Sequence, residues 1–260
     1  MIFVNSVRTA LLVTFFALQM ERTVFDDRFE TFVADTSVSK AIHYNLRYQI
    51  YCLQKRFENP DAFPDDQETD VYDKNSVHFI VRHRESGHWV GAMRLILSVP
   101  ALLPLARLCS LEIDTIKSPH GKLVAEASRL CVLPAPALQL DRNVKSADLP
   151  DIFHPSYVSL GLIRAAREYC LTHDIRFSFF LVTDQLARIL RRVGMEINAV
   201  GPSIQHRGLR RPYIHDNIEG YKRMREKSPL VYEMFQASPP YKYYSKIRPL
   251  RASQTVQLFV

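Results

Sequence analysis

The apolar run IRFSFFLV at residues 175–182 constrains the fold more than any other segment of the chain. A continuous apolar strand of this kind lies inside a sheet, with both of its faces covered. Helical periodicity flanks the run on both sides. The inward positions are Val158, Leu162, Ala165, Ala166 and Tyr169 before it, and Leu186, Ile189, Leu190 and Val193 after it. The run therefore predicts a central strand with a helix before it and another after it.

The segments that precede this strand complete the predicted sheet. A helix begins near Asp35, and its apolar stripe consists of Ile42, Leu46, Ile50, Leu53 and Phe57. Residues 76–83 and 88–99 are typical of two strands of a hairpin, joined by RESG. Residues 122–133 (KLVAEASRLCVL) and 196–201 (EINAVG) are predicted strands as well. This order of elements predicts an α/β fold with a mixed sheet.

The 260 residues suit one large domain with extensions. We expect an N-terminal appendage at residues 1–19, a main domain at residues 20–235 and a C-terminal tail at residues 236–260. The apolar part of the appendage, residues 10–19, is too short to span a bilayer, which needs about 20 residues. Three interpretations of the appendage stay open: an upstream mis-start of the gene, a membrane-touching helix and a cleaved signal peptide.

Cysteine spacing and charge narrow the class of protein. The four cysteines form no CxxC pair and no zinc spacing, which favours reduced, buried thiols in a cytoplasmic protein. The net charge of +7 predicts an acidic partner: nucleic acid, anionic lipid or an acidic protein. Because no nucleic-acid-binding motif accompanies the charge, nucleic acid is not expected. The nine histidines show no metal-ligand spacing, so a metal site is not expected either.

Six charged residues lie within or beside apolar segments, where burial is costly unless the charges are paired. They are Arg47, Asp70, Asp73, Arg94, Glu126 and Arg129. The simplest prediction is one network beside a cleft; the alternative is a set of separate pairs that only support the scaffold. Glu126 and Arg129 have opposite parity on a regular strand, so they would face opposite sides. A β-bulge between them would bring both to one cleft.

These residues, in this order, resemble a group of acyltransferases with the GNAT-like fold. The group comprises acyl-homoserine-lactone synthases, N-acyl amino acid synthases and acyltransferases associated with PEP-CTERM/exosortase gene clusters. The stretch LRYQIYCLQKRFE places Arg47, Tyr51 and Phe57 at the spacing of the family's arginine and two aromatics. Asp70 and Asp73 resemble its paired aspartates, Arg94 its strand arginine, and Glu126 with Arg129 its Glu-x-x-Arg. The resemblance covers roughly residues 22–225. The sequence pattern FVADT…LRYQIYC…FE is most similar to that of the exosortase-associated group.

The resemblance implies a mixed central sheet flanked by helices, and an N-acyltransferase that moves a long-chain acyl group from a thioester to an amine. The thioester arm would lie where the strand of residues 122–133 splays from that of residues 175–182. Glu126 would be the general base, since apolar surroundings raise the pKa of a carboxyl group. N–H groups near Ser128 or Leu130 would stabilise the oxyanion, and Arg129 would join the charged network. The alternative role for Glu126 is that of a salt-bridge partner only.

Two departures from the family bear on the substrates. Phe57 and Tyr51 stand where acyl-homoserine-lactone synthases have a tryptophan and a phenylalanine, so we expect an amino acid or another small amine as acceptor rather than S-adenosylmethionine. The segment between Leu133 and Ser159 contains no glycine, so the glycine-rich loop that cradles the pyrophosphate of CoA is missing. This favours an acyl-carrier protein as the donor of the acyl group.

An acidic carrier protein is expected to dock on the basic helix of residues 183–194. The docking residues would be Arg188, Arg191 and Arg192, and the alternative is that they only form a solvated face. No bound cofactor is expected; the acyl thioester, on carrier protein or CoA, is a co-substrate. Two other functions stay open: an acyl-CoA-dependent GNAT N-acetyltransferase, and a non-catalytic acyl-binding protein on the same fold. Peripheral membrane contact also stays open.

Overall fold

The computed structural model describes residues 24–112, 123–134, 155–237 and 239–247. Nine strands form a mixed sheet in the order β6-β8-β5-β4-β3-β2-β1-β9, with β7 paired to β8. Their bounds are β1 Phe29–Val33, β2 Ser76–His83, β3 Trp89–Ser98, β4 Val124–Val132, β5 Phe177–Val182, β6 Ile197–Ala199, β7 Ile204–Gln205, β8 Leu209–Asp216 and β9 Lys242–Tyr243. The mixed α/β architecture predicted from the sequence is confirmed.

The direction of pairing changes in the middle of the sheet. The pairs β1–β2, β2–β3 and β3–β4 are antiparallel, and β5, β6 and β7 each pair antiparallel with β8. Strands β4 and β5 are parallel, but they pair at only two positions, Ala125 with Ser178 and Glu126 with Phe179. Beyond these positions the two strands are no longer paired, as the resemblance implied. At the other edge, β9 pairs with β1, so residues 242–243 join the sheet.

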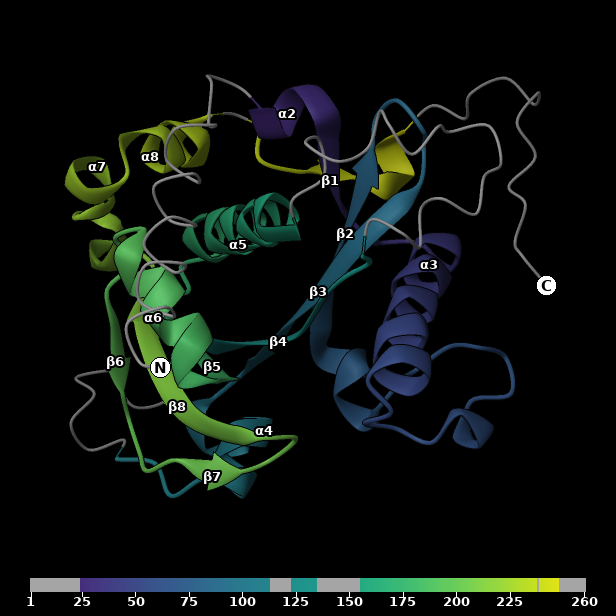
Figure 1. The fold of residues 1–260 in the computed structure, drawn as a ribbon, viewed down its shortest axis with the longest axis horizontal. Coiled ribbons are helices and arrows are strands. Elements are labelled where there is room, and N and C mark those ends of the chain that lie inside the picture. Colours follow the sequence, from purple (N-terminus) through teal and green to yellow (C-terminus); the bar gives the residue numbers. More distant parts are fainter. Residues whose placement is uncertain (1–23, 113–122, 135–154, 238, 248–260) are drawn as a thin grey trace, which may run out of the picture.

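Helices cover both faces of the sheet (Figure 1). Helix α3 lies on one face, against β2, β3 and β4, and α5 lies on the other, against β1 to β4. The bounds of the helices are α2 Val24–Arg28, α3 Ser37–Tyr48, α4 Pro104–Leu108, α5 Pro155–Thr172, α6 Asp184–Arg192, α7 Met224–Lys227 and α8 Pro229–Gln236. We call the two sides of the sheet the α3 face and the α5 face.

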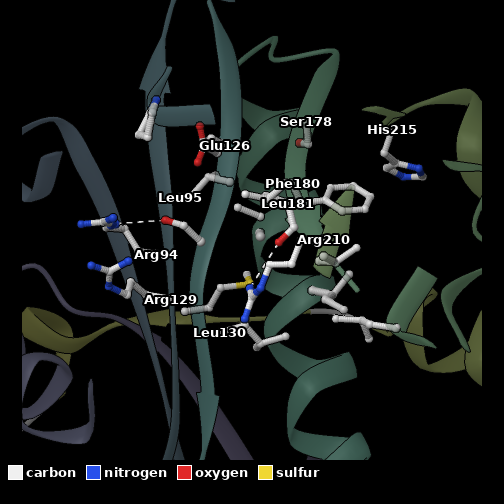
Figure 2. Close-up of a pocket in the computed structure, with 18 of the residues that line it drawn as sticks. Arg94, Leu95, Glu126, Arg129, Leu130, Ser178, Phe180, Leu181, Arg210 and His215 are labelled. Carbon is white, nitrogen blue, oxygen red and sulfur yellow. Dashed lines mark hydrogen bonds between the residues drawn. The ribbon is translucent and has the colours of Figure 1, made fainter. Parts of the chain in front are cut away.

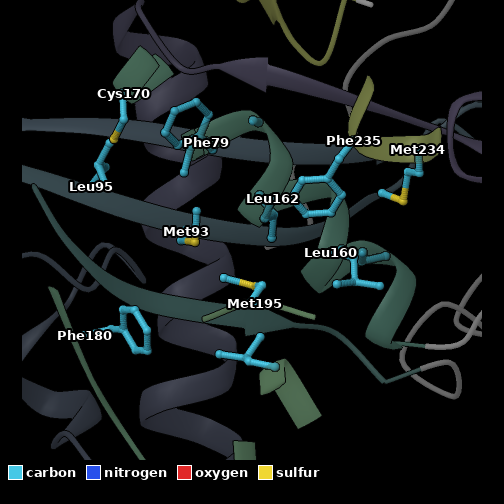
Figure 3. Packing of buried hydrophobic residues seen from close by; sticks show 14 of the residues in the cluster. Phe79, Met93, Leu95, Leu160, Leu162, Cys170, Phe180, Met195, Met234 and Phe235 are labelled. Atoms are coloured by element: carbon cyan, nitrogen blue, oxygen red, sulfur yellow. The ribbon is translucent and has the colours of Figure 1, made fainter. Parts of the chain in front are cut away.

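The largest apolar cluster fills the space between the sheet and α5. The cluster includes Met93 and Leu95 of β3, Leu162 of α5 and Phe180 of β5, and Figure 3 shows Met93 beside Leu162. Smaller clusters lie on the opposite face, where Phe179 packs with Leu103 and Leu105. Neighbouring residues of β5 are thus buried in different clusters, which confirms the prediction of a central strand with both faces covered.

Helix α3 begins as predicted but does not continue regularly. Thr36 caps it, and its side chain accepts a hydrogen bond from the backbone N–H of Ser39. Residues Gln49–Gln54 then form a π-helical turn, in which the N–H of Lys55 donates to the carbonyl of Ile50 at 2.8 Å. The wider turn rotates the residues that follow it about the helix axis. Leu53, predicted to face inward, is 53% exposed, so that prediction is wrong.

Two other differences from the predicted pattern concern short elements. Ile189 of α6 is 48% exposed rather than inward, because Ala187 and Leu190 already cover the buried side of this nine-residue helix. Strands β1, β7, β8 and β9 were not predicted, and two of the first three residues of β8 are arginines. The four cysteines are free and buried, as predicted. None of the helices within the described residues is both long and apolar enough to cross a bilayer.

Candidate active site

A cavity of about 850 Å³ lies where β4 and β5 separate. Part of its wall comes from the α3 face, including Tyr51 of the π-helical turn and Ser128 of β4. Another part comes from the α5 face, including Ile163 of α5 and Phe180 of β5. The cavity therefore connects the two sides of the sheet through the gap between two parallel strands (Figure 2).

A β-bulge in β4 determines where Arg129 points. Arg94 faces Ser128 and Ala92 faces Cys131, so a single residue of β3 faces both Arg129 and Leu130. Arg129 has a φ of 53°, in the left-handed region that residues other than glycine rarely adopt. The extra residue resets the alternation, and Arg129 turns to the face that carries Arg94 and Glu126. The bulge predicted from the sequence is confirmed.

Three arginines and three carboxylates form a closed ring of ion pairs, in which every carboxylate joins two arginines. Glu68 pairs with Arg47 at 2.5 Å and with Arg129 at 3.0 Å. Asp73 pairs with Arg47 at 2.7 Å and with Arg94 at 2.8 Å. Asp70 pairs with Arg94 at 2.5 Å and with Arg129 at 3.1 Å. The structure thus brings together five of the six charged residues predicted to cluster. We call these six residues, Glu68 included, the charged ring.

Two carboxylates of the charged ring, Glu68 and Asp73, stay ionised although they are buried. Arg47 is fully buried, and Glu68 is 1% exposed. Burial alone would raise the pKa of Asp73, but Arg47 and Arg94 outweigh it and hold that pKa at about 2. Burial likewise opposes the ionised form of Glu68, and Arg47 with Arg129 lowers its pKa. Because opposite charges alternate around it, the ring needs no counterion from solvent.

Within the charged ring, two members line the cavity with their charged groups only partly covered. Asp70 is 24% exposed and Arg129 is 15% exposed. Asp70 also begins a short 3-10 helix, Val71–Asn75, and its carboxylate accepts from the N–H of Tyr72. Arg94 lines the cavity too, and its Nε donates to the hydroxyl of Ser128 at 3.1 Å. These residues form a polar, rigid wall on the α3 side.

Glu126 lies on the same cavity but outside the charged ring. It is 6% exposed, and no ion pair involves it within the described part of the chain. Its Oε2 accepts a hydrogen bond from the backbone N–H of Leu105 at 2.9 Å. Burial raises the pKa of this carboxyl to about 7, against the smaller lowering effects of that hydrogen bond and of Arg94. The salt-bridge alternative therefore has no partner among the described residues, and a buried carboxyl with a pKa near neutrality suits proton transfer.

The two predicted aromatics lie together at the α3 side of the cavity. The rings of Tyr51 and Phe57 are 6.2 Å apart, and both residues line the cavity. The hydroxyl of Tyr51 donates to the carbonyl of Leu130, next to the bulge, at 3.1 Å. The guanidinium of Arg129 lies 5.4 Å above the Tyr51 ring. Tyr51 thus connects the π-helical turn to the bulge.

Sequence reasoning missed several charged residues of the site. Glu68 of the charged ring lies in the stretch ETD, where only the aspartate was singled out. Arg207 was counted only as part of a basic run, yet it forms an ion pair with Glu58 and lies 5.9 Å above the Phe57 ring. Arg210 lines the cavity, and its buried Nε finds no hydrogen-bond partner in the described ranges. A sequence signal existed only for Glu68, through its place beside the paired aspartates.

The predicted docking residues lie apart from this cluster. Arg188, Arg191 and Arg192 are exposed on α6, a helix whose other residues Leu186 and Leu190 line the cavity. Arg191 is held by the carbonyl of Ile197 at 3.1 Å. No group of three metal-binding side chains is assembled within the described residues. The cavity wall thus offers Glu126 as a candidate base, together with paired aromatics and several cations.

Comparisons with known proteins bear on the fold. Residues 46–136 match the acetyltransferase (GNAT) domain, a segment that runs from the end of α3 through β4. No curated protein matches the chain. The GNAT match, together with the fold, indicates an N-acyltransferase.

Solved structures show the same fold at low sequence identity. A CoA-dependent acyl-homoserine lactone synthase, BjaI, with SAM and isopentyl-CoA, has a TM-score of 0.55 at 17% identity, covering 83% of this chain and 92% of its own. The AHL synthase LasI has a TM-score of 0.53 at 15% identity, covering 75% and 92%. FeeM, an N-acyl amino acid synthase from uncultured soil microbes, has a TM-score of 0.52 at 12% identity, covering 79% and 97%. The GNAT-like fold is therefore shown.

Proposed function

We propose that this chain, which has the GNAT-like fold, transfers a long-chain acyl group from a thioester to the amine of an amino acid or another small amine. One observation carries the proposal: Glu126, buried and with its pKa raised to about 7, lies where β4 and β5 separate above the cavity. An ammonium group cannot attack a thioester until it loses a proton, and a carboxylate of this pKa can take that proton at neutral pH.

The reaction proceeds by addition and elimination. Glu126 accepts a proton from the ammonium group, and the amine nitrogen attacks the thioester carbonyl. The carbon–nitrogen bond forms, and backbone N–H groups near Ser128 or Leu130 stabilise the oxyanion. The carbon–sulfur bond then breaks, the thiolate takes a proton, and the products are an amide, a thiol and one released proton. Arg129 and the rest of the charged ring hold the bulge in place beside the reacting atoms.

The acceptor is proposed to carry a carboxylate as well as an amine. The cavity wall holds seven cationic side chains, Lys55, Arg94, Arg107, Arg129, Arg167, Arg207 and Arg210, against the carboxyl groups of Asp70 and Glu126. Within the described residues no carboxylate pairs with Arg210. A carboxylate of an amino acid would pair with such a cation. The likeness of the fold to FeeM, an N-acyl amino acid synthase, fits this acceptor class.

The product identifies the reaction. Lipid extracts of cells that express the chain should contain new N-acyl amino acids by mass spectrometry, and cells that express Glu126→Gln should lack them. Acetylated small amines in place of long-chain amides would support the CoA-dependent N-acetyltransferase instead. If neither class of product forms, either in cells or with purified protein and thioesters, the proposed activity is contradicted and the acyl-binding protein remains.

An acyl-carrier protein is the proposed donor. The basic face of α6 supports it, since association between a basic surface and an acidic protein is steered by charge. CoA is the alternative donor, because BjaI is a CoA-dependent enzyme of similar fold. An association with exosortase gene clusters, a cytoplasmic location and peripheral membrane contact stay predictions from the sequence.

Reversing charge on α6 tests the donor. We expect the double variant Arg188→Glu and Arg192→Glu to use acyl-carrier protein about tenfold less well at low salt, because the docking surface becomes repulsive. Use of a short pantetheine thioester should not change, since that donor lacks the acidic protein surface. Initial rates with both donors, over a range of salt concentration, measure the effect.

The matched control reverses two lysines, Lys40 and Lys74, which lie on the α3 side of the sheet and give the same change in net charge. It should retain the wild-type rate with carrier protein. Two results together would establish CoA as the donor. The α6 variant and the wild type would have equal rates with carrier protein, and the wild type would have a higher rate with acyl-CoA than with carrier protein.

A further inference from the structure

The cavity has a second polar region, which the proposed reaction does not use. It is lined by Ser178 of β5 and by His215 of β8, which face each other directly across the two strands. Figure 2 shows His215 on the side of the cavity away from Arg94 and Arg129, with Ser178 between. Asn217 and Tyr221 also line this end. We call this region the distal end.

His215 presents a buried acceptor at the distal end. The side chain is 3% exposed, and its Nδ1 lies 2.8 Å from the carbonyl oxygen of Glu196. A carbonyl oxygen only accepts, so Nδ1 carries the hydrogen. Burial lowers the pKa of His215 to about 4, so the ring is neutral at pH 7. Its Nε2 is then an acceptor, and it is buried with no hydrogen-bond partner in the described part of the chain.

The surrounding residues fix this ring in place. A Cβ at Gly220 would come within 2.3 Å of the imidazole, so only glycine fits there. The ring of Tyr221 meets the imidazole edge-on, with centroids 4.5 Å apart. Because the imidazole is held from two sides and by Glu196, Nε2 cannot turn away to find another partner. An unsatisfied buried acceptor in a rigid setting requires an explanation, and a ligand that supplies the missing donor provides one.

Arg167 of α5 adds a donor beside this acceptor. Its guanidinium lies 4.5 Å above the ring of Tyr221, the same ring that contacts His215. Its Nε is buried without a hydrogen-bond partner, and no carboxylate pairs with it within the described residues. Ser178 and Asn217, by contrast, hydrogen-bond to each other at 2.9 Å. The open donor and the open acceptor at the distal end are therefore those of Arg167 and His215.

The wall on the way to the distal end is apolar. Phe180, Leu190 and Met195 line it, and each is 8% exposed or less. A ligand that passes from the gap between β4 and β5 toward His215 therefore contacts hydrocarbon first and polar atoms last. This order matches a hydrocarbon chain with a polar group far from its thioester.

We propose that the acyl chain carries a hydroxyl group in its distal part, which donates to Nε2 of His215 and accepts from the guanidinium of Arg167. Only a group that both donates and accepts satisfies the two side chains. A ketone or a carboxylate offers no hydrogen to Nε2, and a plain methyl end leaves both groups unsatisfied. The inference rests on the proposed acyl transfer, because that reaction makes the cavity the site of the acyl chain.

A comparison of paired donors tests the inference. Acyl-pantetheine thioesters of equal length would be compared with and without a hydroxyl group, placed in turn at each carbon of the distal half. We expect kcat/KM to be at least about tenfold higher for the best hydroxylated donor, since a site built to hydrogen-bond a hydroxyl discriminates against chains that lack it. Equal or higher kcat/KM for the plain chain, at every hydroxyl position, would overturn the inference.

Two variants assign the preference to the distal end. His215→Phe and Arg167→Met should each bring the ratio of kcat/KM for the hydroxylated donor to kcat/KM for the plain donor toward unity. Arg167 is only half-buried, so Arg167→Met should fold. This variant therefore tests the assignment even if His215→Phe does not fold. His173→Phe, at an exposed position on the α5 side, is the matched control and should keep the preference. A preference that survives in Arg167→Met and in a folded His215→Phe contradicts the assignment.

A binding measurement separates this inference from the proposed reaction. Titration calorimetry would compare a free hydroxy fatty acid with the unsubstituted acid of the same length. Tighter binding of the hydroxy acid, lost in Arg167→Met, would support the distal site even if no donor gives an amide product. The same affinity for both acids would overturn the distal site even if acyl transfer is established.

Discussion

The variant Glu126→Gln should turn over at least about 100-fold more slowly than the wild type, the usual contribution of a general base. The amide has the size of the carboxyl group and retains an oxygen to accept from the N–H of Leu105, so the fold should persist. The measurement is kcat with saturating donor and acceptor, under conditions in which the chemical step limits the rate. Thermal unfolding of both proteins checks that the fold is retained.

The pH profile gives a second readout of the same residue. Because the ionised carboxylate is the active form and its pKa is raised to about 7, kcat/KM of the wild type should rise with pH through about 7 and then level off. This rise should disappear in Glu126→Gln. Charging Glu126 costs folding free energy, since its pKa is higher in the folded state, so the amide variant should be no less stable above pH 7.

The control for this prediction is Glu233→Gln, which removes an exposed carboxylate from α8. It should keep both the wild-type rate and the rise near pH 7. Turnover of Glu126→Gln within a few-fold of the wild type, with the chemical step still limiting, would remove Glu126 from the mechanism.

Replacing Arg47 by Met should lower the free energy of unfolding by about 3–5 kcal/mol, the cost of breaking a buried ion pair by removing one partner. Arg47 is fully buried and pairs with both Glu68 and Asp73. Without it, each of these carboxylates keeps one arginine instead of two. Since the whole domain is expected to be stable by only about 5–15 kcal/mol, the loss should be plain in urea unfolding followed by circular dichroism.

The matched control is Arg176→Met, in an ion pair with Asp216 at 2.8 Å in which the arginine is 56% exposed. Solvent screens such a pair, so this variant should lose no more than about 1 kcal/mol. If Arg47→Met lowered the free energy of unfolding by no more than about 1 kcal/mol as well, the buried ion pairs of Arg47 would stabilise the fold no more than a solvent-exposed pair does.

The sequence predicted the parts of this site that leave a local pattern. Charged residues within an apolar strand require partners, and this requirement points to Glu126, to Arg129 and to the bulge between them. The central strand was predictable from its apolar run, and the hairpin of β2 and β3 from alternation around RESG. In each case, neighbouring residues along the chain contain the physical cause.

Other features depend on contacts between distant segments, which no local pattern records. Glu58 and Arg207 are 149 positions apart and meet only because the β7–β8 hairpin folds over the cavity. The open acceptor of His215 depends on the carbonyl of Glu196, just before β6, and on Gly220 beyond the end of β8. The π-helical turn escaped prediction because its residues fit an ordinary helical pattern as well.

That turn has a consequence for how such a site can change. A π-helical turn contains one residue more than an α-helical turn, as if a single residue had been inserted into the helix. Losing one residue between Gln49 and Gln54 would restore regular helical geometry and rotate the preceding and following segments relative to each other by about 100°. Tyr51 and Phe57 would then meet the cavity differently without any substitution. In an evolving lineage, the aromatic part of the cavity wall can thus be rebuilt by gain or loss of one codon, while the charged ring, which depends on Arg47 before the turn, keeps its anchor on α3.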